Sequence, residues 1–213
     1  MHFGYIQRIA TLCSAGLLSL MILIPSANAI PTEIDFVPGS NDHLLTRSGG
    51  LDWLDLTQTR GQSVADVLAG FGGWSTAGFG YATGSQVTAL LTDFGFTINT
   101  ESNADASNAA WFLQRFGATM PPPDPPDIIQ TFGIFSPNGV PSEIYSLALV
   151  HLRAVDPLPV GLAQTYVSDW GRDSTNSSIG SFLVRPVPEP GTLAIFGLGL
   201  AGLGLMRRRR KTA

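Results

Sequence analysis

The residues of this chain that could bind a ligand gather in one run near the C-terminal end, 169–176, with the sequence DWGRDSTN. Its carboxylate, amide and carbonyl oxygens are the ligands that calcium takes in proteins, although their spacing matches no EF-hand. Its tryptophan could stack on a sugar ring or could be a half-buried structural residue, and acidic loops between strands are commonly simple turns. The candidate ligand or calcium residues are Asp169, Trp170, Asp173 and Asn176.

Paired carboxylates and two histidines are the other groups that could do chemistry. Asp52 with Asp55, or the two aspartates of the run above, could serve a glycan hydrolase, but nothing in the sequence sets their separation. His43 and His151 have no neighbouring ligand at a metal-binding spacing. The sequence contains no Gly-x-Ser-x-Gly elbow, HExxH helix or phosphate loop. We therefore expect no catalytic residue, no bound metal and no cofactor.

Three segments in the first half of the chain have the features of short helices. The first two begin with the spacing of a capping box, and two glycines would end the first one at about residue 71. The second has apolar residues at positions i, i+3, i+4 and i+7, which form one face of a helix. The predicted helices are 63–71, 83–94 and 105–116.

Strand-like segments dominate the second half, separated by turns rich in Pro, Gly, Asn and Asp. An earlier segment, 51–56, is also strand-like, and we expect it to pair with the last strand. This order predicts an α+β domain with two to three short helices in its first half and an antiparallel sheet mainly from its second half. A proline-rich extended loop is expected at 120–127. The later strands are predicted at 131–135, 143–152, 162–168 and 179–185.

The first 29 residues have the pattern of a signal peptide, whose apolar part we expect to be helical. A short start with one arginine precedes an apolar stretch, and Ala27 and Ala29 form a small-x-small cleavage site. We expect cleavage after Ala29, which would also remove Cys13, the single cysteine. The mature domain, 30–186, would then have no disulfide or thiol chemistry.

The mature domain is acidic. Residues 30–186 contain 15 Asp and Glu against six Arg and no Lys, a net charge of −9. Such a surface argues against nucleic acid and against anionic membranes as partners. It suits a soluble extracellular protein, or one that gathers divalent cations.

The last part of the chain, 187–213, has three features in a fixed order. An uncharged run at 192–206 would span roughly 22 Å as a helix, and arginines that extend outward would help it cross a core of about 30 Å. The basic end would stay on the cytoplasmic side. A simple C-terminal anchor is the alternative interpretation. The motif that precedes the run is Val187, Pro188, Glu189 and Pro190, and the cations that follow it are Arg207, Arg208, Arg209, Arg210 and Lys211.

These three features together resemble the PEP-CTERM sorting signal, which is also known as the C-terminal domain of certain ice-binding proteins. The resemblance implies recognition by an exosortase, a polytopic membrane enzyme of the cysteine transpeptidase type. It further implies export in Gram-negative bacteria that make exopolysaccharide. A signal of this kind is an address and does not specify an activity.

A second resemblance covers parts of the central domain. The segments 53–59, 80–87 and 180–185 are similar to a module in other PEP-CTERM proteins that has "WLDLT", "GWRYAT" and "G-x-[FY]-L-V-R" segments. That module has a C-type-lectin-like topology. Gln86 stands where the pattern has an acid, and the mature domain has no Cys pair and no Glu-Pro-Asn or Trp-Asn-Asp calcium signature.

The leading hypothesis is an exported, non-catalytic protein that an exosortase processes while it is transiently anchored in the membrane. It would then reach the cell surface or the exopolysaccharide matrix. A carbohydrate- or ice-binding module is the first alternative, although the chain lacks the regular threonine repeat that ice binding normally needs. A secreted glycan-active enzyme is the second alternative.

Overall fold

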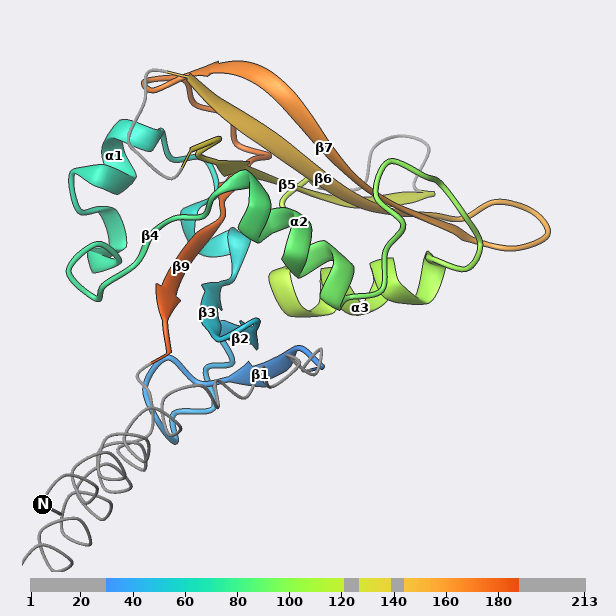
Figure 1. Ribbon diagram of the computed structural model, residues 1–213, viewed down its shortest axis with the longest axis horizontal. Helices are drawn as coiled ribbons and strands as arrows, with labels where there is room; N and C mark the ends of the chain where they lie inside the picture. The colour runs from blue at the N-terminus through green and yellow to red at the C-terminus, as the bar shows by residue number, and fades with distance from the viewer. Residues whose placement is uncertain (1–29, 121–126, 139–143, 188–213) are drawn as a thin grey trace, which may run out of the picture.

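The computed structural model of the chain describes residues 30–120, 127–138 and 144–187. The predicted signal peptide 1–29 and the predicted membrane helix 192–206 lie outside the described residues, as does most of the proline-rich loop 120–127. The described part consists of two β-sheets with helices between and beside them (Figure 1). The α+β class is therefore confirmed, and the longest strands come from the second half of the chain, although the first half adds four short strands of its own.

The first sheet has five strands, and all of its pairs are antiparallel. Its third strand pairs with the last strand of the domain, with Trp53 opposite Val184, as expected. That third strand ends at Leu54, because Asp55 caps the 3₁₀ helix η1 (Leu56–Thr59) that follows. In spatial order the strands are β1 (Thr32–Ile34), β2 (Leu45–Ser48), β3 (Leu51–Leu54), β9 (Leu183–Pro186) and β4 (Gly80–Tyr81).

The second sheet has four strands in the order β7 (Val160–Gly171), β6 (Ile144–Arg153), β5 (Ile128–Phe135) and β8 (Gly180–Ser181). The pairing of β5 with β8 is parallel and the other two pairings are antiparallel. The strand predicted at 179–185 is thus two strands, β8 and β9, in different sheets. The prediction of a single antiparallel sheet from the second half was wrong on this point.

The change of sheet takes place at Phe182. Its backbone N–H donates to the carbonyl of Ile134 in β5 (2.8 Å), and its own carbonyl accepts from the N–H of Ala82 beside β4 (2.9 Å). Gly180 lies so close to η1 that a Cβ there would be 2.1 Å from the carbonyl oxygen of Leu56. Only glycine fits at this approach.

The three predicted helices are present as α1 (Val64–Leu68), α2 (Gly84–Asp93) and α3 (Ala106–Phe116). Both predicted capping boxes form, with Ser63 at the start of α1 and Thr83 at the start of α2. The first helix ends earlier than predicted, because Gly70 turns to φ 108° and a short 3₁₀ turn, η2 (Phe71–Gly73), follows.

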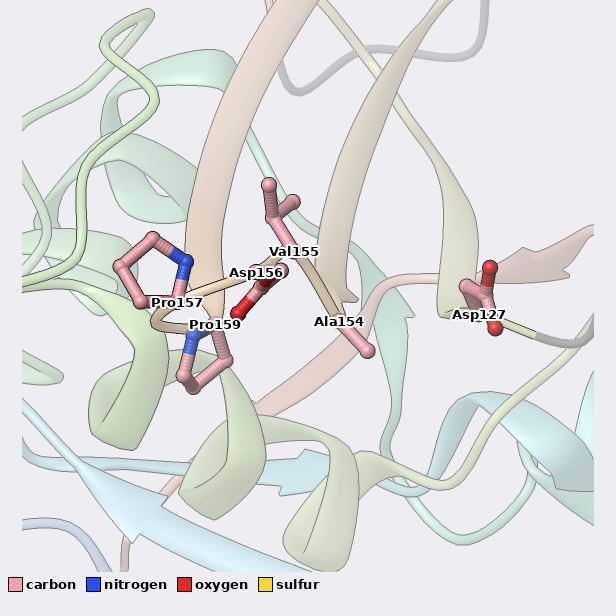
Figure 2. A pocket seen from close by; sticks show the side chains of 6 residues that line it. All are labelled: Asp127, Ala154, Val155, Asp156, Pro157 and Pro159. Atoms are coloured by element: carbon pink, nitrogen blue, oxygen red, sulfur yellow. The ribbon is translucent and has the colours of Figure 1, made fainter.

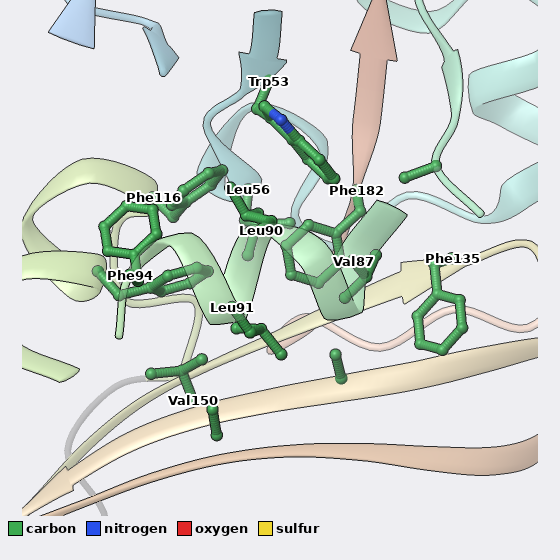
Figure 3. Close-up of a cluster of buried hydrophobic side chains, with 14 of the residues drawn as sticks. Trp53, Leu56, Val87, Leu90, Leu91, Phe94, Phe116, Phe135, Val150 and Phe182 are labelled. Carbon is green, nitrogen blue, oxygen red and sulfur yellow. The ribbon is translucent and has the colours of Figure 1, made fainter. Parts of the chain in front are cut away.

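The main core lies between the two sheets and is filled from α2 and α3 (Figure 3). Trp53 and Phe182 contribute from β3 and from the segment that joins the sheets, and their rings meet edge to face at 6.2 Å. From α3, Phe112 stacks on Phe116 at 4.4 Å. Two smaller clusters lie on the opposite faces of the sheets, one around Trp74 and Phe79 and the other around α1. None of the helices in the described part is of a length and apolarity that would let it cross a bilayer.

A truncation series tests how far the fold depends on its last strand. A chain of residues 30–187 should unfold in one cooperative transition, whereas one that ends at Ser181 should not fold. The shorter chain lacks buried Phe182, Leu183 and Val184, and losing the phenylalanine alone costs about 3–5 kcal/mol of a total stability of about 5–15 kcal/mol. Thermal unfolding followed by circular dichroism measures this, with a chain ending at Pro186 as the control. A cooperative transition in the Ser181 chain would contradict the dependence.

Candidate functional site

The predicted ligand run 169–176 does not form one loop. β7 continues to Gly171, so Asp169 and Trp170 lie within the strand, while Asp173 and Asn176 lie in the exposed turn that follows. The strand is longer than predicted because it bulges: Leu147 is opposite Tyr166, whereas Tyr145 is opposite Trp170.

Several oxygen atoms of this run already have partners. The side-chain oxygen of Asn176 accepts from the N–H of Ser178 (2.8 Å), and the carbonyl of Arg172 accepts from the N–H of Ala65 in α1 (3.1 Å). Trp170 is half-buried and packs against the cluster around Tyr145. Within the described residues no group of three or more His, Cys, Asp or Glu is arranged to hold a metal ion. The calcium site in this run stays a prediction, and its tryptophan packs against the core.

Among the carboxylates that form ion pairs in the described residues, Asp52 is the most buried. It is 1% exposed and lies in β3 between two arginines, with Arg47 Nε at 2.8 Å and Arg185 Nε at 3.3 Å. The guanidinium of Arg185 also lies over the rings of Phe79 (4.8 Å) and Phe36 (5.4 Å). These contacts hold the end of β9 in place. The carboxylate of Asp52, which the sequence suggested as one half of a catalytic pair, therefore has a structural role.

Asp55, the other half of that pair, caps η1. Its Oδ1 accepts from the N–H and the hydroxyl of Thr57, both at 2.8 Å. Burial raises the pKa of the Asp55 carboxyl, the hydrogen bonds from Thr57 oppose this rise, and the neighbouring charge of Glu33 adds to it. No hydrogen bond joins Asp52 to Asp55 in the part of the chain that the structure describes, and each is committed to its own partners.

The two histidines lie in different parts of the domain. His43 Nδ1 is 3.7 Å from Asp35 and 4.0 Å from Glu33, beside β1. His151 Nε2 is 3.3 Å from Glu101, a carboxylate that also pairs with Arg153 at 2.8 Å. Each histidine therefore has acidic neighbours of its own, and the structure does not bring the two together.

A surface that the sequence did not single out is the side of the four-stranded sheet that faces away from α2 and α3, which we call the outer face (Figure 1). Residues that face the helices, such as Val150 and Ala163, alternate with residues that do not. Helix α1 covers one end of this face, around Ile134 and Tyr145. The remaining part carries Gln130, Phe132, Leu147, Leu149, His151, Leu162, Gln164 and Tyr166.

Most of the outer face is half-buried, and Tyr166 is 37% exposed with its hydroxyl donating to Gln164 (2.6 Å). The uninterrupted apolar run in β6 was the available signal for strand burial on both sides. It could not show that α2 and α3 cover one side, whereas α1 covers only one end of the other.

A shallow hollow lies at the far end of the same sheet, at the turn from β6 to β7. Asp127, Ala154, Val155, Asp156, Pro157 and Pro159 line it. Figure 2 shows the two prolines on one side of the turn and Asp127 on the other, with Ala154 between them. The N–H of Ala154 donates to the carbonyl of Asp127 (2.8 Å), so backbone pairing joins the two sides of the hollow.

Of the predicted sorting residues, only Val187 is described. Its N–H donates to the carbonyl of Gly50 (3.1 Å), and Pro186 before it is opposite Leu51. The cleavage residues Ala27 and Ala29, the motif residues Pro188 to Pro190, and the cations from Arg207 to Lys211 lie outside the described residues.

Comparison with known proteins identifies one family. Residues 186–211 match the family model of the PEP-CTERM protein-sorting motif. No curated protein and no solved structure is significantly similar to the chain. The motif marks a protein that is exported, held at the membrane, processed by an exosortase and sorted to the cell surface. The ice-binding and lectin-like resemblances stay predictions.

The role of Asp52 is open to a direct stability test. Asp52→Ala should lower the free energy of unfolding by about 3 kcal/mol, because it leaves two cations without their buried partner. Arg47→Ala should cost about 1 kcal/mol or less, since that side chain is 45% exposed. Urea unfolding measures both, with exposed Asp169→Asn as a control near zero. Equal losses for the aspartate and the control would refute the structural role.

The raised pKa of Asp55 leads us to expect an unusual dependence of the free energy of unfolding on pH. Its folded-state pKa is raised, so its stabilising contribution is full at acidic pH and is lost as the pH rises through the folded-state pKa. Asp55→Asn keeps an oxygen that can accept from Thr57 and cannot ionise. Relative to the wild type, this variant should become more stable between about pH 3 and about pH 7, by urea unfolding. A difference that stays constant with pH would contradict the assignment.

Proposed function

We propose that this chain is a non-catalytic surface or matrix protein that associates with exopolysaccharide after an exosortase has processed it. The host would be a Gram-negative bacterium that makes such a polymer. The sorting motif at 186–211, directly after the last strand of a folded domain, carries this proposal. A sorting motif at this position would direct the whole domain to the outside of the cell.

The use of the acidic residues supports the non-catalytic part. Asp52 and Asp55, which could have formed a catalytic pair, are engaged in a buried ion pair and a helix cap. Retaining and inverting glycosidases both need two free carboxylates that flank one bond. The net charge of −9 over residues 30–186 suits a protein that stays soluble outside the cell.

The outer face is the surface best suited to a polysaccharide. Sugar rings stack on exposed aromatic side chains and receive hydrogen bonds from amide groups, and this face offers Tyr166 beside Gln164, with Gln130 on the opposite flank of the sheet. Such a surface favours a binding module over an enzyme.

Co-sedimentation of the protein with the host's exopolysaccharide tests the proposal. We expect saturable binding that Tyr166→Ala weakens by about ten-fold, since losing one stacked ring costs about 1–2 kcal/mol. Phe71→Ala is the matched control, because Phe71 is also exposed (40%) but lies in η2, outside the four-stranded sheet. Loss of binding with a chelator would point instead to the 169–176 run. An absence of binding in all conditions would overturn the exopolysaccharide association and leave the sorting.

A further inference from the structure

Both termini of the described domain leave the five-stranded sheet at the same end of its strands, and we call this end of the sheet the exit edge. Thr32, Arg47, Asp52 and Arg185 lie opposite one another in a single row across β1, β2, β3 and β9. Because neighbouring strands run in opposite directions, the chain before Thr32 and the chain after Arg185 point the same way. The turn from β2 to β3 lies at the same edge. Figure 1 shows β1 beginning and β9 ending at the lower left of the ribbon.

The sorting motif begins inside this sheet. The family match starts at residue 186, whereas β9 ends at Pro186 and Val187 still donates to Gly50. The first two residues of the motif therefore belong to the folded domain. An extended chain advances at most about 3.3–3.6 Å per residue, so Pro188 to Pro190 stay within about 11 Å of Val187, which is bonded to the β2–β3 turn.

The β2–β3 connection is a tight two-residue turn. Gly49 and Gly50 both have positive φ, 59° and 75°, as in the tight two-residue turns of β-hairpins. Both are exposed and have no side chain, so an approaching protein meets bare backbone here. A larger turn would occupy the space beside the motif.

We infer that the exit edge, with the β2–β3 turn at its centre, is a contact surface for the membrane-embedded enzyme that processes the tail. This inference rests on the sorting function. An enzyme whose cleft holds Pro188 to Pro190 must place its own atoms within about 11 Å of Val187, the residue that is bonded to this turn. The start of the described domain lies at the same edge, because β1 lies three strand spacings, about 14 Å, from β9.

The test enlarges the turn in the full-length chain in its host. Inserting a short Gly-Ser segment of about four residues between Gly49 and Gly50 should slow the processing of the tail by about ten-fold, measured as the fraction of shortened protein by mass spectrometry over time. The same insertion between Val155 and Asp156, in the β6–β7 turn of the other sheet, is the matched control and should leave the rate unchanged (Figure 1).

A second variant separates contact from damage to the fold. It carries the turn insertion and, after Val187, a Gly-Ser linker of about eight residues followed by a second copy of Pro186 and Val187, so that the motif stays intact. Such a linker spans about 15 Å on average and moves the motif away from the turn, and it should restore processing to the wild-type rate.

The outcomes distinguish this inference from the sorting function. An unchanged rate with the enlarged turn would overturn the contact surface, and so would a slow rate that the linker fails to restore. If the unmodified chain and a variant with Pro188, Glu189 and Pro190 changed to alanine both keep the tail, then the processing itself is absent and both ideas fall. Slow processing that the linker restores, with the alanine variant unprocessed, supports both.

Discussion

The fold depends on the backbone of Phe182, which is bonded to both sheets. It donates to Ile134 in the four-stranded sheet and accepts from Ala82 beside the five-stranded sheet. Its ring fills the core against Gly133, where a Cβ would come within 2.3 Å of it. The residues before Phe182 form β8, and those after it form β9 in the interior of the other sheet. The two sheets are thus held together by the last part of the described domain.

This arrangement links folding to the position of the sorting motif. The domain has no complete five-stranded sheet until β9 takes its place between β3 and β4. Because β9 ends at Pro186 and the motif starts there, the chain must have reached the motif before the domain can close. A membrane-held tail would then keep the newly closed domain beside the membrane, since Val187, at the end of the described residues, is still bonded to the sheet.

The features that could be predicted from the sequence were local. Both capping boxes formed, because their hydrogen bonds join residues three positions apart. The tail was identified because the order of its three features resembles the PEP-CTERM signal, and the match at 186–211 confirms this. The pairing of Trp53 with Val184 was also expected, as a means of closing the domain at its ends.

The features that could not be predicted depend on contacts between distant segments. The split of 179–185 into two strands follows from the approach of Gly180 to Leu56, which no periodicity shows. The partners of Asp52 depend on the register of three strands, although the two glycines after Ser48 were a signal for a tight turn that would put Arg47 opposite Asp52. Asp169 and Trp170 became part of β7 because a bulge opposite Ser146 lets that strand continue.

The central position of β9 also decides which part of the motif an enzyme can reach. Val184 has a paired neighbour on each side, Trp53 in β3 and Gly80 in β4, so no outside strand can add to β9 there. An edge strand in the same place could be drawn into a partner by strand addition. If the inferred contact holds, the enzyme must therefore reach the chain after Val187, while β9 fixes where the motif leaves the domain at the exit edge.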